Sequence, residues 1–385
     1  MLMAAGHPLE RVQRIGTIVG ALGTVACLVG LALNPTQFFQ SYLVAYILWV
    51  GCALGCLAIL MINHVTGGAW GVAIRRFLES GTQTLPLMAI AFLPIAAGMG
   101  TLYEWVTPDH LAHDALLQHK QAYLNVPFFL ARTVAYFIAW IVVARALRRW
   151  SLVQDTRTDD LPADRLELIS RGGLVLLGLT MSFAAIDWMM SLEPHWQSTI
   201  YGMLFMAGSV LTAFAVMIPI AAVAASQEPY RSIVTPDQFQ DLGKLLLGFV
   251  MVWAYFSFSQ FLIIWSANLP EEIPWYLRRS GGGWNVIVLI LIVGHFALPF
   301  VVLLSRSAKR RARTMARLGM FLLMVRFLDV FWMISPAFHP EGFAMHWLDF
   351  ATVIGLGGFW LAALVRNLDG VPLLPLHDPA LPMPE

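Results

Sequence analysis

A few charged residues lie inside long apolar runs of this sequence, where they are costly to bury. Asp187 falls before the run that ends at Leu192 has finished, and Arg326 and Asp329 lie three positions apart in a later run. A carboxylate in hydrocarbon costs several kcal/mol unless it is neutralised, paired or facing water. Because residues three apart share a helix face, an ion pair between Arg326 and Asp329 would lower that cost. Such groups serve proton transfer or helix packing, and the spacing favours neither use.

Three further residues extend this set through the membrane. Arg132 lies near the start of the fourth apolar run, where it could reach the membrane surface or act as the counter-charge of Asp187. His295 lies near the middle of the eighth run, and a histidine that meets water titrates near neutral pH. His64, near the end of the second run, is the clearest titratable group on the inner side. Charged groups spread in this way suit a proton relay.

Two other features supply further candidate residues for the proton path. One is a polar stripe that can also serve helix packing, and the other lies at the membrane surface. A polar stripe in the seventh run extends from Tyr255 to Gln260, and such hydroxyls and amides often serve hydrogen bonds between helices. Glu193 and His195 flank Pro194 at the end of the fifth run. Proline disfavours helix in the residue before it, so this polar corner is expected to close the helix at the membrane surface.

The composition places the chain in a lipid bilayer. It is 58% hydrophobic and 12% charged, whereas about 25% of the residues in soluble domains are charged. Ten runs approach the roughly 20 apolar residues that a membrane-spanning helix needs. They cover approximately residues 15–33, 40–64, 85–103, 127–147, 172–192, 199–225, 243–267, 284–305, 316–335 and 346–366. We therefore expect an all-α polytopic membrane protein with ten transmembrane helices.

The sequence carries no sign of a redox centre or a nucleotide site. Its three cysteines lie in apolar runs, and they form neither a haem-attachment motif nor iron–sulfur spacing. His295 is the one histidine deep in a run, which argues against a haem held by two histidines. The Gly281–Gly283 run lacks the lysine of a phosphate-binding loop. We expect no cofactor in this chain.

The distribution of lysine and arginine predicts the orientation. The loops and ends on one side hold 19 of these residues, and those on the other side hold 3. Since positive charge stays on the cytoplasmic side, both termini are expected in the cytoplasm of a bacterial inner membrane. The ends of the helices that carry Asp187 and Asp329 then point outward.

An internal repeat is plausible, because the segment 188–191 (Trp-Met-Met-Ser) resembles the segment 332–335 (Trp-Met-Ile-Ser). An even number of spans separates the two segments, so the repeat would be parallel. The predicted units are the N-terminus and first flanking helix at 1–39, a first four-helix bundle at 40–198, a second at 199–340, and a last flanking helix with a proline-rich cytoplasmic tail at 341–385. From Leu368 the tail is expected to lie extended on a partner or in solvent.

Four segments resemble those of a known family, the ActF membrane subunits of bacterial alternative complex III, which are NrfD/PsrC-like proteins. The segments are 187–199 (Asp-Trp-Met-Met-Ser-Leu-Glu-Pro-His-Trp-Gln-Ser-Thr), 256–265, 268–276 (Asn-Leu-Pro-Glu-Glu-Ile-Pro-Trp-Tyr) and 326–329 (Arg-Phe-Leu-Asp). The resemblance implies two four-helix bundles with two flanking helices. The candidate residues inside the matching segments are Asp187, Glu193, His195, Arg326 and Asp329.

The resemblance also implies partners and a function. The partners would be a homologous ActC-type membrane subunit that oxidises quinol, an iron–sulfur subunit and haem c subunits, with menaquinol bound in the complex. This chain would be a non-redox, non-catalytic subunit that contributes to proton translocation coupled to menaquinol oxidation. A subunit that binds quinol itself is the alternative. A stand-alone secondary transporter and a purely structural anchor also remain open.

Overall fold

The computed structural model describes residues 8–157, 159–226, 228, 230–375 and 378, and all regular structure in them is helical. The helices are α1 (Pro8–Leu33), α2 (Pro35–Thr66), α3 (Arg75–Thr82), α4 (Leu85–Ile90), α5 (Leu93–Ala97), α6 (Met99–Leu102), η1 (Glu104–Val106), α7 (Pro108–His113), α8 (Ala115–Lys120), α9 (Val126–Gln154), α10 (Leu161–Trp188), η2 (Met190–Leu192), α11 (Tyr201–Ala224), α12 (Tyr230–Ile233), α13 (Pro236–Ala267), α14 (Pro274–Arg278), α15 (Trp284–Ile290), η3 (Leu291–Ala297), α16 (Leu298–Leu304), α17 (Arg306–Lys309), α18 (Ala312–Ile334), η4 (Ser335–Ala337) and α19 (Trp347–Arg366). Within these described residues, ten helical segments are long and apolar enough to cross a membrane. The expectation of an all-α, multi-pass chain is confirmed to that extent.

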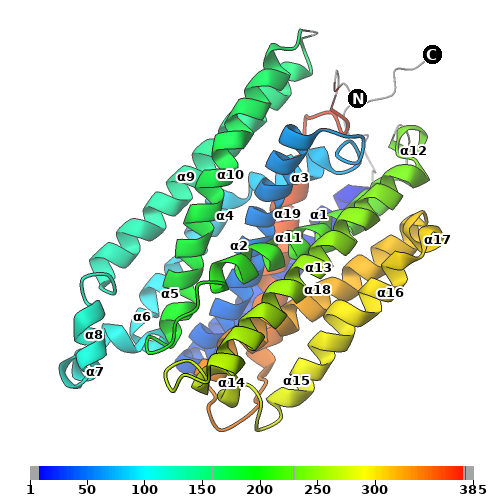
Figure 1. Cartoon of the computed structure of the whole chain (residues 1–385). Helices are drawn as coiled ribbons and strands as arrows, with labels where there is room; N and C mark the ends of the chain where they lie inside the picture. Colours follow the sequence, from blue (N-terminus) through cyan, green and yellow to red (C-terminus); the bar gives the residue numbers. More distant parts are fainter. Residues whose placement is uncertain (1–7, 158, 227, 229, 376–377, 379–385) are drawn as a thin grey trace.

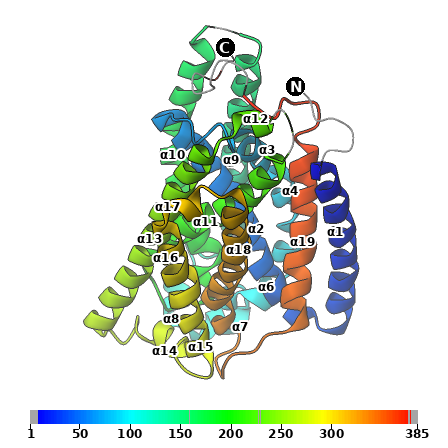
Figure 2. The same ribbon diagram turned by 90° about the vertical axis from the view of Figure 1, so that its right-hand side faces the viewer.

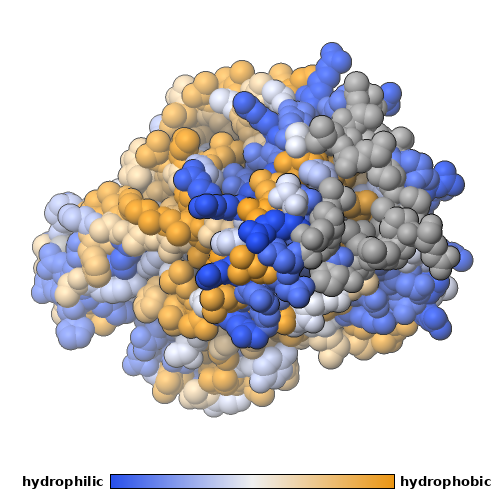
Figure 3. Space-filling view, turned by 90° about the horizontal axis from the view of Figure 1, so that it is seen from above, coloured by the Kyte–Doolittle hydropathy of each residue, from blue (hydrophilic) through white to orange (hydrophobic). Residues whose placement is uncertain are grey.

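The long helices run side by side between two ends of the molecule (Figure 1). One end carries α12 and α17, and we call it the α12 end. The other carries α7, α8 and α14, and we call it the α14 end. The start of α1 and the end of α19 both lie at the α12 end (Figure 2). Hydrophilic residues gather on that end among hydrophobic ones (Figure 3).

Helices α2 and α11 form the centre of the molecule. Helix α2 is buried along its whole apolar length and packs on α3, α10, α11 and α19, whereas α11 also contacts α13 and α18. Small residues let these two helices approach closely, because a Cβ at Gly55 would lie 2.1 Å from the Ser209 carbonyl oxygen. Helix α1 lies outside this centre and packs mainly along α19.

Capping residues fix where several of the long helices begin. Asn34 accepts a hydrogen bond from the Gln37 amide at the start of α2, and Asn125 does the same for α9. Thr235 and Gln238 form a reciprocal capping box at the start of α13. These side chains satisfy amides that have no partner inside the helix, so the chain turns where the sequence supplies them.

For the third span, predicted at 85–103, both the predicted start and the prediction of one continuous helix are wrong. The segment begins at Arg75 and is broken into α3, α4, α5 and α6. Pro86 and Pro94 stand in the first turns of α4 and α5. Since proline has no amide hydrogen and clashes with the preceding turn, each ends the helix before it. This segment therefore consists of four short helices rather than one continuous helix.

Two other expectations need correction. Helix α10 ends at Trp188 and is followed by η2, so the helix stops before the Glu193–His195 corner that was expected to close it. The described part of the tail is packed rather than extended in solvent, because Leu368, Leu373 and Leu374 are buried. The tail packs on the protein because these leucines bury apolar surface against the α12 end of the core.

Candidate functional site

Asp187 and Arg132 form a two-pronged ion pair between α10 and α9. Arg132 Nε lies 2.9 Å from Asp187 Oδ2, and Arg132 Nη2 lies 2.8 Å from Asp187 Oδ1. The predicted counter-charge is therefore in place. This fork geometry is the strongest arrangement that arginine makes with a carboxylate, and it neutralises a carboxylate that is completely buried.

Neighbouring side chains hold this pair in one orientation. The Tyr136 hydroxyl donates to Asp187 Oδ2 at 2.8 Å, and Arg132 also donates to the Tyr123 carbonyl oxygen at 3.0 Å. The guanidinium lies 3.8 Å from the centre of the Tyr123 ring. Asp187 thus receives donors on both oxygens, which satisfies a buried charge and joins the ends of α9 and α10. We call Arg132 and Asp187 the outer pair.

Arg326 and Asp329 form the predicted ion pair within α18. Two other helices contribute to it: Trp253 of α13 donates to Asp329 Oδ2 at 3.1 Å, and Arg326 Nε donates to Thr212 Oγ1 of α11 at 3.3 Å. Both charged side chains are 4% exposed. We call these four residues and His295 the core cluster.

His295 completes the core cluster and differs from all its other members. Its side chain is fully buried, its ring centre lies 3.9 Å from that of Trp253, and neither ring nitrogen has a hydrogen-bond partner among the described residues. Buried polar groups are nearly always paired, so an unpaired imidazole indicates bound water or a functional use. The other titratable side chains of the cluster, Arg326 and Asp329, are paired with each other. Among the described residues of the cluster, His295 alone is titratable and has no hydrogen bond.

The backbone around His295 is also unusual. Residues 291–297 form a π-helix, η3, between α15 and α16. Pro299 lies at the start of α16, and a proline ring clashes with the carbonyl four residues earlier, which here is that of His295. Widening the turn relieves that clash. Single π-turns are often found at functional sites.

Glu193 and His195 lie at the α14 end, apart from the core cluster. Glu193 pairs with Arg278 at 2.9 Å and with the buried Arg279 at 2.6 Å. Burial lowers the pKa of Arg279, and the charge of Glu193 offsets part of that effect. These contacts tie the segment after α10 to α14.

His195 makes a second contact at this end. Its Nε2 lies 2.7 Å from Asp114 Oδ2 in the segment that carries α7 and α8. Desolvation raises the pKa of Asp114, but hydrogen bonds from the Leu116 and Leu117 amides and the nearby imidazole outweigh it, so the pKa lies below its ordinary value. His195 therefore serves to hold the outer segments together, and its side chain is 59% exposed.

A buried ionic network at the α12 end was missed in the sequence. Glu79 of α3 is fully buried and pairs with Arg75 at 3.1 Å and Arg76 at 2.7 Å, while Ser151 of α9 donates to it. Arg75 and Arg76 are among the 19 basic residues expected in the loops and ends on one side. That expectation is wrong for these two arginines, because both lie in α3 and are buried. The Arg-Arg-x-x-Glu spacing is itself a signal of ion pairs on one helix face. This network fixes α3 against α9.

The two remaining candidates lie outside these clusters. His64 Nδ1 lies 3.0 Å from Ser170 Oγ, which joins α2 to α10 near the α12 end. Tyr255 is 66% exposed on α13 and makes no hydrogen bond within the described residues. The structure thus brings Asp187 to Arg132 and His295 to Arg326 and Asp329. It brings neither His64 nor Tyr255 to those groups, and in the described residues no hydrogen bond links the outer pair to the core cluster.

A cavity of about 350 Å³ opens at the α14 end between the end of α10, the segment 197–200 that precedes α11, and α13. Gln260 stands in its wall, where its amide oxygen accepts from Ser198 at 2.9 Å and its amide nitrogen donates to the Tyr276 hydroxyl at 3.3 Å. Burial raises the pKa of Tyr276 to about 12. The lining also holds apolar side chains, among them Ile186 and Ile263, and three more polar ones, Gln197, Thr199 and Glu272.

Comparison of the chain with protein-family models and with curated proteins gives no match. The site must therefore be interpreted from its own geometry. Among the described residues, no group of histidine, cysteine, aspartate or glutamate side chains is arranged to hold a metal ion.

Proposed function

We propose that this chain is a non-redox membrane subunit of a quinol:electron-acceptor oxidoreductase of the alternative complex III type, and that it contributes to proton translocation. The observation that carries the proposal is His295, a buried imidazole whose two nitrogens have no partner among the described residues and which contacts Trp253, the indole that donates to Asp329. Titratable groups inside a membrane protein are costly and mark ion or proton pathways by default. The resemblance of four sequence segments to ActF subunits supports the type of complex.

The chemistry assigned to the core cluster is the transient holding of a proton. His295 can accept a proton on either nitrogen, while Asp329 is held by Arg326 and by the Trp253 indole. Movement of Arg326 toward or away from Asp329 would change the charge that His295 meets, because interactions between charges are strong where water is excluded. The outer pair and the Glu79 network act as fixed ends that hold the helices around this cluster.

The proposed assembly follows from the same resemblance. Helices α2, α3–α6, α9 and α10 would form one four-helix bundle, α11, α13, α15–α16 and α18 the other, and α1 and α19 would flank them. The α12 end would face the cytoplasm of a bacterial inner membrane. Menaquinol oxidation would occur in an ActC-type partner, with iron–sulfur clusters and haem c in further subunits.

Co-purification tests the assembly. A tagged chain extracted from its own membranes in mild detergent should bring stoichiometric c-type haem, visible in the reduced-minus-oxidised spectrum, together with quinol-oxidising activity. A colourless single polypeptide without that activity would overturn the proposed complex and would favour a stand-alone transporter.

A quinol-binding role is the second candidate, and the cavity at Gln260 favours it. Its lining combines apolar side chains of α10 and α13 with polar side chains, and small-molecule sites combine such groups in this way. Replacing Gln260 with Leu should then raise the KM for quinol several-fold while kcat changes little. An unchanged KM would remove this cavity as a quinol site.

A further inference from the structure

One face of α9 remains exposed along most of the helix. Val134, Ile138 and Val142, each four residues from the next, are 57%, 58% and 60% exposed. The same face continues with Arg145 and Arg149, which are also exposed. An apolar stripe that faces lipid thus leads directly into two arginines at the α12 end.

These two arginines are unpaired, unlike the buried arginines beside them. Within the described part of the chain, neither Arg145 nor Arg149 makes a hydrogen bond or an ion pair. Arg148 is mostly buried: it donates to the Asn367 carbonyl oxygen at 2.7 Å and lies 3.8 Å from Glu79. Glu79 is already paired with two other arginines, so this corner of α9 has excess positive charge.

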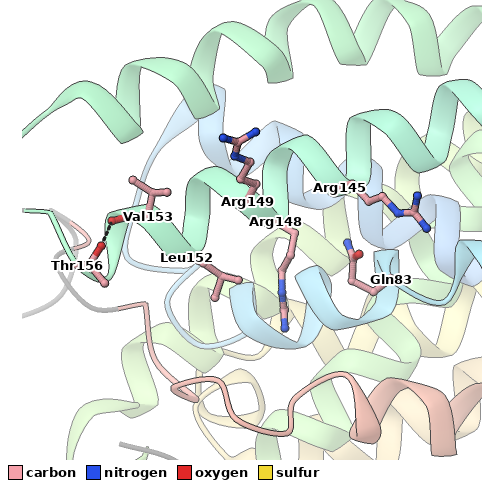
Figure 4. A pocket seen from close by; sticks show the side chains of 7 residues that line it. All are labelled: Gln83, Arg145, Arg148, Arg149, Leu152, Val153 and Thr156. Carbon is pink, nitrogen blue, oxygen red and sulfur yellow. Dashed lines mark hydrogen bonds between the residues drawn. The ribbon is translucent and has the colours of Figure 1, made fainter.

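A cavity of about 460 Å³ opens at these arginines, against the turn between α3 and α4 (Figure 4). It is lined by Gln83, Arg145, Arg148, Arg149, Leu152, Val153 and Thr156. Figure 4 shows the guanidinium groups of Arg145, Arg148 and Arg149 pointing in different directions from α9, and no carboxylate is among the lining residues. Arginine forks fit the oxygens of a phosphate.

The spacing along α9 matches a lipid rather than a free anion. Val134 and Arg145 are eleven residues apart, which is about 16 Å along a helix. Half of the hydrocarbon core of a bilayer is about 15 Å thick. One acyl chain laid along the stripe would therefore place its headgroup phosphate at Arg145 and Arg149.

We propose that this face of α9 binds one anionic phospholipid from the leaflet at the α12 end. The phosphate lies at Arg145 and Arg149, with Arg148 behind it, and an acyl chain lies along Val134, Ile138 and Val142. Basic pockets of this kind at the membrane surface are suited to anionic headgroups. The proposal is independent of the function proposed above, because none of these residues belongs to the outer pair or the core cluster.

Native mass spectrometry of the full chain tests the site. The variant R145Q/R149Q should lose a bound phosphatidylglycerol that the wild-type chain retains, with about thirtyfold weaker binding if each arginine supplies the usual attraction. The matched control is R313Q/R317Q, which removes the same charge from two exposed arginines, also four residues apart, near the start of α18. The control should retain the lipid, and R145K/R149K should recover most of the binding.

Two further measurements distinguish the source of the phosphate. Phosphatidylglycerol should bind better than phosphatidylcholine in mixed-lipid nanodiscs, and inorganic phosphate should not displace it. Equal retention by wild-type chain and R145Q/R149Q, equal binding of the two lipids, or full displacement by inorganic phosphate would each overturn the proposal. An unchanged melting temperature of R145Q/R149Q is the folding control.

Discussion

At the scale of single residues, Asp187 and His295 are two buried titratable side chains that differ in how fully they are hydrogen-bonded. Asp187 is saturated, since Arg132 reaches both of its oxygens and Tyr136 donates to one of them. His295 is the opposite, because neither nitrogen has a partner in the described structure. Its hydrogen bonds hold the Asp187 carboxylate in place. The imidazole of His295 can gain or lose a proton without breaking a hydrogen bond to another described residue.

Removing one member of the outer pair should be far more costly than removing both. The variant R132A leaves Asp187 charged and buried, and loss of one partner of such a pair typically costs about 3–5 kcal/mol. The double variant R132L/D187L should recover much of that loss. Thermal unfolding in detergent measures both. Equal melting temperatures for the single and double variants would show that the pair is not coupled.

Much of this residue-level arrangement was open to prediction from the sequence. The Arg326–Asp329 pair follows from a spacing of three, and Arg132 lies at a depth that suits Asp187. Contacts between distant helices were not open to prediction. The Trp253–His295 contact joins α13 to η3 and depends on how those helices pack. The Glu79 network has a local signal that was overlooked, because its arginines were treated as loop charges.

At the scale of elements, the helix contacts depend on small residues and prolines. A Cβ at Gly23 of α1 would lie 2.2 Å from the Gly355 Cα of α19, so this crossing tolerates no side chain. Prolines explain what the apolar runs did not predict: Pro86 and Pro94 break the third span, and Pro299 accounts for the π-turn at His295. Hydropathy predicts that a span exists, whereas the prolines determine where its helix is interrupted.

The crossing of α1 and α19 gives a prediction at this scale. The variant G355V should lower stability by about 1–3 kcal/mol, because the two backbones must separate to admit the side chain. The matched control is G178V on α10, where an added Cβ meets no atom within 4 Å. Thermal unfolding should distinguish them. Comparable melting temperatures for the two variants would contradict the close crossing.

At the scale of the whole molecule, the sequence predicts ten spans, and the described part of the chain has ten helical segments that are long and apolar enough to cross a membrane. The helices α12 and α17, which hold Arg231, Arg306 and Lys309, lie at the opposite end of the molecule from α8 and α14, which hold Lys120 and Arg278 (Figure 1). The parallel repeat stays a prediction, although α10 and α18 are each followed by a short 3-10 helix, η2 and η4. The charge distribution along the sequence predicts an orientation, but it does not predict that α1 packs mainly along α19.

Thiol labelling tests the orientation. Ser226 at the α12 end and Ser280 at the α14 end are both exposed. In intact cells, a membrane-impermeant thiol reagent should label S280C and should reach S226C only after the inner membrane is opened. The unsubstituted chain is the control for its own three cysteines. The reverse pattern would invert the proposed topology.

The most direct measurement of the central claim is the proton-to-electron ratio of the purified complex in sealed vesicles. The variant H295F keeps an aromatic ring beside Trp253 but removes the titratable group, and H119F changes an exposed histidine at the α14 end as the control. We predict that H295F lowers the ratio while quinol oxidation stays within about twofold of the wild-type rate, a change of under 0.5 kcal/mol in its barrier, and that H119F changes neither. A wild-type ratio in H295F would contradict a role for the core cluster in proton translocation.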